Sequence, residues 1–289
     1  MNSLRDIKQR IGNIDSTKQI IRAMDMIAST KLQKVRVQLE GVRPIYGNLK
    51  RIAEELGCHK DAHSHIFYNN SSIESNDTLY IVITSDRGLS GSYNANILSK
   101  SYAHMNQEGV NEKILVVGSK GYEFFKKRNK HILRTVTDLT DAQVYYVAES
   151  IANWLTDYYL SGKVKEVYIA YTHFETVLSY VPYVEKLLPL SCSGLKEYFD
   201  RKYEPDVKTF IDHLVPIYLH MNLFRAFSES HTSEQAARMV NMSSAGKNAE
   251  EIIEDLTRMF NRKRQAVITQ ELSEIVGSVS ILNKGELDG

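Results

Sequence analysis

Apolar positions in the first 56 residues recur in alternating steps of three and four. A seven-residue repeat sustained over this length predicts one coiled-coil helix over residues 1–56. Pro44 is expected to bend or weaken that helix, and two core helices joined near Pro44 are the alternative. Only a lysine and an aspartate interrupt the series, which reads Leu4, Ile7, Ile11, Ile14, Lys18, Ile21, Asp25, Ala28, Leu32, Val35, Leu39, Val42, Tyr46, Leu49, Ala53 and Leu56.

The middle of the chain has a different pattern. Residues 57–76 are polar and read as a linker. Short apolar runs then alternate with helix-like segments through residues 77–205, which predicts a Rossmann-like α/β domain with a mainly parallel sheet. Thr140 or Asp141 is expected to cap the longest of these helices. The predicted strands are 79–85, 113–118, 132–136, 167–171 and 184–190, and the predicted helices are 94–107, 122–128 and 141–160.

Helical spacing returns after Pro205 and predicts a C-terminal coiled-coil helix over residues 206–289. Its apolar positions fall into one phase, then a polar stretch, then the same phase again, and finally a shifted phase. A polar stretch weakens packing against one partner helix and is typical of a helix whose neighbours change. The two terminal helices are expected to pair antiparallel around the inserted domain. The first phase of the C-terminal helix contains Leu214, Ile217, Met221 and Phe224, and the polar stretch contains Ser228, His231, Gln235 and Arg238. The same phase returns at Met242, Ala245, Ala249, Ile252, Leu256 and Met259, and the shifted phase contains Ile268, Leu272, Ile275, Val279 and Leu282.

Composition narrows the range of functions. The 289 residues carry a net charge of only +1, which argues against a general nucleic-acid-binding coat. Basic residues are nevertheless in excess over residues 1–56, so that segment is the expected surface for an acidic protein partner. Cys58 and Cys192 lie far apart, which suggests no disulfide framework and fits a reducing compartment. We expect neither a membrane-spanning segment nor a secretory signal.

The stretch "TSDRGLSGSYN", residues 84–94, follows an apolar run and precedes a helix, as many phosphate-binding loops do. A P-loop needs Lys and then Ser or Thr after its last glycine, and a dinucleotide loop needs three spaced glycines. This stretch has only Gly88 and Gly91 and lacks that lysine, so a tight turn is the better interpretation. A nucleotide-binding α/β protein dimerised through a coiled coil remains the alternative.

Two further groups of residues were weighed as sites. Cys58, His59, His63 and His65 have metal-binding side chains, but their spacing matches no standard zinc pattern. His173 lies near Glu175 without a nucleophile fixed beside them. We therefore expect no metal, no cofactor and no catalytic residue.

Three stretches carry a family resemblance. "TKQIIRAMDMIASTKLQKVR" (17–36), "TSDRGLSGSYN" (84–94) and "TSEQAARMVNMSSAGKNAEEIIEDLTRMFNRKRQAVITQELSEIVGS" (232–278) resemble the gamma subunit of F-type ATP synthases. The resemblance implies a non-catalytic central-stalk rotor that couples ion-driven rotation of the c-ring to ATP synthesis or hydrolysis at the beta subunits. It also implies alpha, beta and epsilon subunits as partners, and a peripheral position on the cytoplasmic face of the bacterial cell membrane.

The resemblance also implies which residues face the alpha/beta hexamer. Ser90 stands where relatives usually have cysteine, and Ser92 and Tyr93 replace glycine and leucine. The cysteine-containing insertion of chloroplast relatives is not evident, so thiol control of that type is not expected. The implied contact residues are Lys18, Arg22 and Met24; Asp86, Arg87 and Ser90; Arg238; Arg264, Gln265, Thr269, Gln270 and Glu271; and the apolar Ile275, Val276, Val279 and Leu282.

Overall fold

A computed structural model describes residues 3–108, 111–192, 203–204 and 206–285 of the chain. It divides into two compact units. The terminal unit comprises Met1–Ile27 and Met242–Gly289, and the central unit comprises Ala28–Asn241. Both divisions between the units fall inside long helices, and each unit is described by itself.

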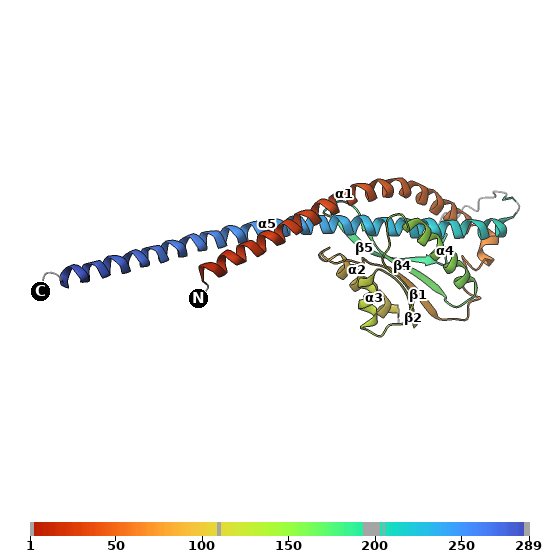
Figure 1. Cartoon of the computed structure of the whole chain (residues 1–289). Coiled ribbons are helices and arrows are strands. Elements are labelled where there is room, and N and C mark those ends of the chain that lie inside the picture. The colour runs from red at the N-terminus through yellow and green to blue at the C-terminus, as the bar shows by residue number, and fades with distance from the viewer. Residues whose placement is uncertain (1–2, 109–110, 193–202, 205, 286–289) are drawn as a thin grey trace. The chain divides into compact units, whose positions relative to one another are not determined.

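The central unit contains one five-stranded sheet (Figure 1). Its strand order is β3-β2-β1-β4-β5. β1, β2, β3 and β4 run parallel, and β5 pairs antiparallel with β4. The predicted mainly parallel sheet is therefore confirmed. The strands are β1 (Asp77–Ile83), β2 (Asn111–Val117), β3 (Ile132–Val136), β4 (Glu166–Phe174) and β5 (Tyr180–Leu188).

Helices cover both faces of this sheet (Figure 1). Alternate residues of β1 separate the two faces, because side chains along a strand point to opposite sides. Tyr80 and Val82 pack in a cluster with α2 (Tyr93–Glu108) and α3 (Ser119–Lys126). Leu79 and Ile81 pack in the larger cluster with α4 (Val144–Leu160), α1 (Leu4–Gly57) and α5 (Val207–Gly285).

The N-terminal segment forms one uninterrupted helix, α1 (Leu4–Gly57), which contains Pro44. Every position of the predicted heptad seam is buried or half-buried. The alternative of two helices joined near Pro44 is wrong. Pro44 and Glu40 are both exposed, so water can hydrogen-bond the Glu40 carbonyl that a proline four residues later leaves without its helical donor.

The C-terminal segment is also one helix, α5 (Val207–Gly285). Within the central unit it is enclosed by other elements, and residues 222–230 are all buried. A helix buried on all sides needs partners on every face. The sheet, α1 and α4 supply them in the larger core cluster.

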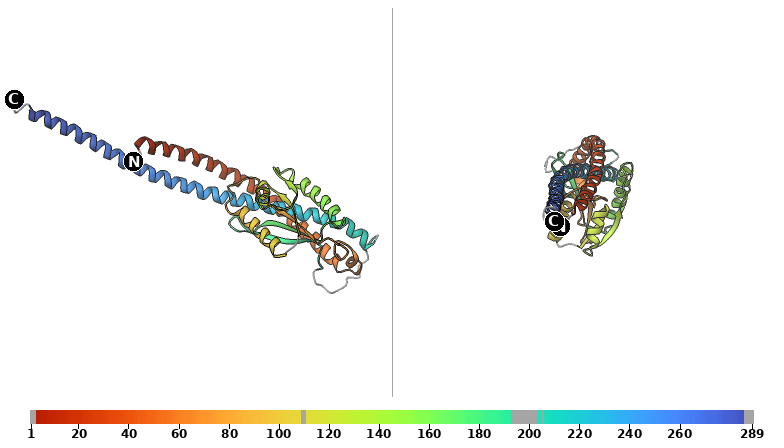
Figure 2. Two further views of the ribbon diagram at one scale, coloured as in Figure 1. Left: turned by 90° about the horizontal axis from the view of Figure 1, so that it is seen from below. Right: turned by 60° about the vertical axis from the view of Figure 1, so that its left-hand side comes forward.

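In the terminal unit, the start of α1 lies antiparallel beside α5, and α5 continues past the start of α1 (Figure 2). The predicted α5 seam is partly wrong here. Ile252 and Met259 are 47% and 54% exposed, whereas Ile253 and Phe260 are half-buried in their place. The seam therefore continues from Ala249 by a step of four rather than three, which rotates the buried stripe by one residue.

Two local predictions need correction at helix ends. α4 begins at Val144 rather than Asp141, and neither predicted cap acts as one, because Gln143 is the N-cap and makes no side-chain capping bond. The Gln143 side-chain oxygen instead accepts hydrogen bonds from the backbone and hydroxyl of Thr140. The predicted linker contains a short 3₁₀ helix, η1 (Lys60–Ser64).

The two cysteines form a disulfide, contrary to the expectation from their sequence separation. Cys58 directly follows α1 and Cys192 follows β5, and their Cα atoms lie 5.2 Å apart. The two residues are 134 positions apart in sequence. The sequence separation of the two cysteines therefore did not predict their disulfide. The disulfide forms because the fold places the end of α1 beside the segment after β5.

Candidate functional site

The loop between β1 and α2 is held by bonds to neighbouring loops. The Asp86 carboxylate accepts hydrogen bonds from the backbone N–H and hydroxyl of Ser119 and from the backbone N–H of Asp138. Ser90 is only 2% exposed. Asp86 is thus engaged within the chain and Ser90 faces inward, so Arg87 is the exposed member of the three predicted contact residues.

The same loop docks onto α5. Gly91 has φ +58°, and the Asn241 side chain occupies the space where a Cβ would stand. Arg238 donates a 3.4 Å hydrogen bond to the Gly88 carbonyl and is paired with Glu234 at 2.5 Å. Glycine is needed here because α5 approaches the backbone closely, and the space beside it is filled by Asn241 rather than open to a phosphate. Arg238, one of the residues predicted to face a partner, thus also connects this loop to α5.

Gly91→Ala is expected to lower the free energy of unfolding of the central unit by about 1–3 kcal/mol, because the new Cβ meets Asn241 in a strained backbone conformation. Gly88→Ala is the matched control, since nothing lies within 4 Å of a Cβ there; we expect it to stay within about 0.5 kcal/mol. Urea unfolding followed by fluorescence of the single tryptophan, Trp154, measures both. Equal effects of the two substitutions would contradict the docking role of Gly91.

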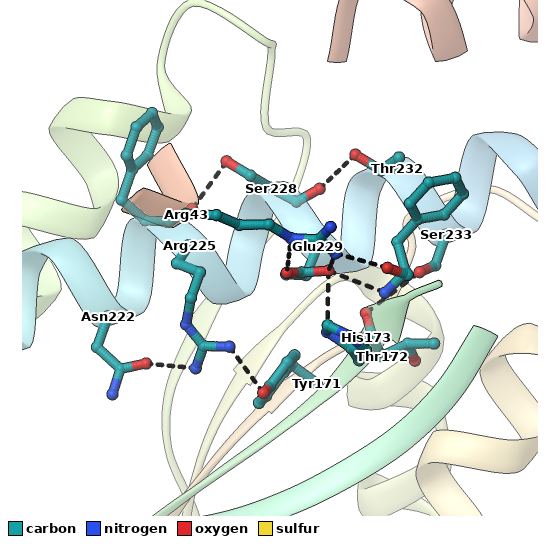
Figure 3. A network of polar contacts seen from close by, with 12 residues as sticks. Arg43, Tyr171, Thr172, His173, Asn222, Arg225, Ser228, Glu229, Thr232 and Ser233 are labelled. Atoms are coloured by element: carbon teal, nitrogen blue, oxygen red, sulfur yellow. Dashed lines mark hydrogen bonds and ion pairs between the residues drawn. The ribbon is translucent and has the colours of Figure 1, made fainter. Parts of the chain in front are cut away.

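A buried carboxylate joins α1, β4 and α5 (Figure 3). Glu229, whose side chain is 1% exposed, accepts two 2.8 Å hydrogen bonds from the guanidinium of Arg43. It also accepts a 2.8 Å bond from the Phe174 backbone N–H and lies 3.2 Å from Nδ1 of His173. A bidentate, hydrogen-bonded pair of this kind offsets the cost of burying its charges.

A second buried charge lies one helical turn earlier on α5 (Figure 3). Arg225 donates hydrogen bonds to the Tyr171 hydroxyl at 2.7 Å, the Asn222 side chain at 2.7 Å and Glu185 at 2.9 Å. Its guanidinium also lies 4.2 Å from the ring centre of Tyr46 on α1. Burial disfavours its charge, yet Tyr171 and Glu185 raise the pKa of Arg225 above its usual value. The guanidinium thus links α5 to α1, β4 and β5.

Residues in the polar stretch of α5 hydrogen-bond to the end of β4 that does not pair with β1. β1 pairs with β4 only as far as Ala170, so the backbone groups of the following residues need other partners. Ser230 accepts a bond from the Thr172 N–H, and Ser233 donates to the Thr172 carbonyl. Ser230 and Ser233 therefore hold α5 to the end of β4. The seam residue Ser228 instead donates to the Phe224 carbonyl within α5, and His231 lies 3.8 Å from Asp141.

The sequence did not predict three groups of polar contacts. They are the pair of Glu229 with Arg43, the contacts of Arg225, and the hydrogen bonds from α5 to β4. A signal was present for Arg225, because the other positions of the helical run over residues 214–227 are mostly apolar. His173, weighed as a catalytic residue, belongs to the Glu229 group. Glu175 lies in the turn after β4 and accepts a bond from Ser179.

The predicted contact residues of the terminal unit lie on two helices. On α1, Lys18 and Arg22 both pair with Glu250 of α5, at 3.1 Å and 2.5 Å. These two cations lower the pKa of the exposed Glu250 carboxyl. Met24 is 36% exposed. The structure brings Lys18 and Arg22 together and leaves Met24 at the surface.

The remaining predicted residues lie near the end of α5. All of those with described side chains are exposed, Ile275 and Val276 by 59% and 67%. Val279 and Leu282 lie outside the residues whose side chains the structure describes. With the exposed Ile268 and Leu272, the described residues form an exposed strip of polar and apolar groups near the end of α5: Arg264, Gln265, Ile268, Thr269, Gln270, Glu271, Leu272, Ile275 and Val276.

The histidines near Cys58 do not converge. His65 lies 3.1 Å from Asp212, and His59 lies 3.6 Å from Asp61. Across the part of the chain that the structure describes, no group of three or more His, Cys, Asp or Glu side chains is placed to hold a metal ion. None of the described helices is both long and apolar enough to cross a membrane.

Comparison with known proteins agrees with this architecture. The family model described as ATP synthase matches residues 3–282. The chain is 36% identical to the ATP synthase gamma chain of Moorella thermoacetica, with 98% of this chain and 100% of the relative covered. It is 37% identical to that of Ruminiclostridium cellulolyticum, with 97% and 99% covered.

Solved structures share the fold. A chain in the OSCP/F1/c-ring structure of the Euglena gracilis mitochondrial ATP synthase matches with TM-score 0.68 at 18% identity, covering 98% of this chain and 95% of that one. A chain of the central stalk/c-ring structure from Tetrahymena thermophila matches with TM-score 0.62 at 24% identity, covering 78% and 99%. This chain belongs to the family of ATP synthase gamma chains.

Proposed function

We propose that the chain is a rotor that performs no bond chemistry itself and couples rotation of a c-ring to ATP synthesis or hydrolysis at beta subunits. Its partners in this proposal are an alpha/beta hexamer around the long helices, an epsilon subunit and the c-ring. The complex would lie at the cytoplasmic face of a bacterial cell membrane, with this chain as a peripheral subunit.

The observation that carries the proposal is the exposed strip near the end of α5. Figure 2 shows that α5 continues past the start of α1, and large apolar side chains near the end of α5 are exposed. Such side chains are stabilised when a partner covers them, at about 1.5–3 kcal/mol for each large one fully buried. A hexamer enclosing the helix supplies that cover. Ile268, Leu272, Ile275 and Val276 are 46–67% exposed.

The polar core of the central unit suits the transmission of force. A rotor passes torque only if its body turns together with its helices. The Arg43–Glu229 pair and the Arg225 group fix α1 and α5 to β4 and β5 through short hydrogen bonds that are buried or half-buried. Such bonds are directional, so sliding a helix against the sheet would leave buried charges unpaired.

Weak surface pairing in the terminal unit suits repeated contact with several subunits. Exposed ion pairs such as Arg22 with Glu250 contribute only about 0–1 kcal/mol each. Coupling arises when the shaft binds the conformations of successive beta subunits unequally. Many weak contacts provide such differences without trapping the rotor at one position.

The test is a rotation assay on the assembled complex. The chain is co-expressed with alpha, beta and epsilon subunits of the same source, and a bead is attached through a biotin-acceptor peptide inserted after Gly162. We expect co-purification and one-directional rotation that requires ATP, with the same complex lacking ATP as the control. A chain that purifies alone, or a bead that stays still while the complex hydrolyses ATP, would refute the proposal.

A further inference from the structure

A strongly basic segment at one edge of the sheet is not explained by the rotor role. Residues 126–134, "KKRNKHILR", hold five Lys or Arg and no acidic residue, although the whole chain has a net charge of only +1. The segment runs from the end of α3 into β3. Its positive charge is therefore concentrated where the sheet ends.

The cations of this segment are mostly without carboxylate partners. Lys130 pairs with Glu112 of β2. Within the described parts of the chain, the other four lie in no ion pair; Arg128 lies 3.6 Å from the ring centre of Phe124, and Lys126 lies 5.2 Å from that of Tyr122. Aromatic faces hold these cations in place without neutralising them. The segment therefore keeps its charge available to an anionic ligand.

A groove runs between α3 and β3 beside these cations. Its volume is about 510 Å³. Four consecutive residues of β3 line it, although consecutive side chains point to opposite faces of a strand. The groove therefore follows the edge of the strand rather than one face. We call it the β3 groove, and its lining is Tyr122, Lys126, Asn129, Lys130, Ile132, Leu133, Arg134 and Thr135.

The edge of β3 can accept another strand. β3 is the last strand of the sheet and pairs only with β2. The Val136 carbonyl accepts a bond from the Gly118 N–H on the β2 side. Alternate residues of a strand direct their backbone groups to opposite edges, so the amide of Thr135 points away from β2. An exposed edge of this kind is a template for strand addition.

We propose that the β3 groove binds an extended, acidic segment of another protein as an added strand beside β3. The strand edge supplies backbone hydrogen bonds, Tyr122, Ile132 and Leu133 offer apolar surface, and the cations select acidic side chains. A charged residue on an edge strand, here Arg134, also discourages pairing with a second copy of the same chain. The positive charge of residues 126–134 favours an acidic partner. The proposal does not depend on the rotor role.

The proposal is tested with a fluorescein-labelled eight-residue peptide of alternating valine and glutamate. Binding to the full chain is measured by fluorescence anisotropy at low ionic strength. We expect saturable binding that weakens about tenfold or more in the double variant Lys126→Glu, Arg134→Glu. Lys247→Glu changes one exposed charge in the terminal unit and is expected to bind the peptide as the unchanged chain does.

A second probe separates strand addition from simple charge attraction. The same peptide with alternate backbone nitrogens methylated keeps its charge but loses half of its donors, so we expect it to bind at least about tenfold more weakly. Thr135→Pro removes the outward amide on the protein and is expected to have the same effect. Equal binding of the methylated peptide, no binding of either peptide, or binding instead to vesicles of phosphatidylglycerol would overturn the proposal.

Discussion

Replacing Glu229 by alanine is expected to lower the free energy of unfolding of the central unit by up to about 3–5 kcal/mol. Removing Glu229 leaves the Phe174 N–H without its acceptor and the Arg43 guanidinium, whose side chain is 37% exposed, without its carboxylate. The cost of breaking a fully buried pair, about 3–5 kcal/mol, is the upper bound of this loss. Three groups lose their contact with the carboxylate in this variant, because Glu229 accepts bonds from Arg43 and the Phe174 N–H and lies beside His173. This single residue fixes α5 to both α1 and β4, so its loss should weaken the whole unit.

The measurement is urea unfolding followed by fluorescence of Trp154, which lies on α4 of the central unit. Glu40→Ala is the matched control, since Glu40 lies on α1 in an exposed pair with Arg36; we expect a loss of about 0–1 kcal/mol. Glu229→Gln should fall between the two, because an amide can still accept a hydrogen bond from Arg43. A loss for Glu229→Ala as small as that for Glu40→Ala would show that the buried pair does not stabilise the unit.

The long helices and the mainly parallel sheet could be predicted because the spacing of apolar residues along each segment indicates which side chains are buried. The heptad series of α1 indicated one helix despite Pro44, and alternating strands and helices indicated a mainly parallel sheet. The phase of the α5 seam was harder to assign. Ile252 and Ile253 are adjacent residues of the same type, and only the position of α1 decides which of them is buried.

The polar core could not be predicted in the same way. Arg43 and Glu229 are 186 residues apart in sequence, and no local pattern indicates which buried charge pairs with which. The disulfide between Cys58 and Cys192 has the same origin, with 134 residues of separation. Partners at such distances are chosen by the topology of the fold, and a single sequence carries no periodic signal for them.

The glycine-containing loop shows how a local motif can mislead. The order of strand, glycine turn and helix suggested phosphate binding, and the missing lysine and glycine argued against it. The structure supplies the positive reason for Gly91, whose left-handed backbone and missing side chain admit Asn241 of α5. That contact lies 150 residues along the chain from the loop, so the sequence could exclude one role but could not name the other.

Truncating the chain after Gln265 is expected to reduce rotation-coupled ATP turnover of the assembled complex roughly tenfold, with the fold of the central unit unchanged. The truncation removes the exposed strip from Thr269 to Val276 and the residues beyond it. Burial of even one large apolar side chain against a partner contributes about 1.5–3 kcal/mol, and 1.4 kcal/mol corresponds to about a tenfold change in an equilibrium constant. The central unit should unfold at the same urea concentration as in the full chain, because the removed residues belong to the terminal unit.

A variant of full length distinguishes the contribution of the apolar side chains of α5 from the contribution of its length. In the triple variant Ile268→Ala, Leu272→Ala, Ile275→Ala the helix keeps its full length but loses three apolar side chains that are 46–59% exposed. If partner burial of these groups carries the coupling, this variant should lose most of the turnover that the truncation loses, whereas Thr269→Ala alone should lose little because many positions share the contact. If the triple variant is fully coupled while the truncation is not, length alone matters. Full coupled turnover in the truncated chain would show that this part of α5 has no role in the motor.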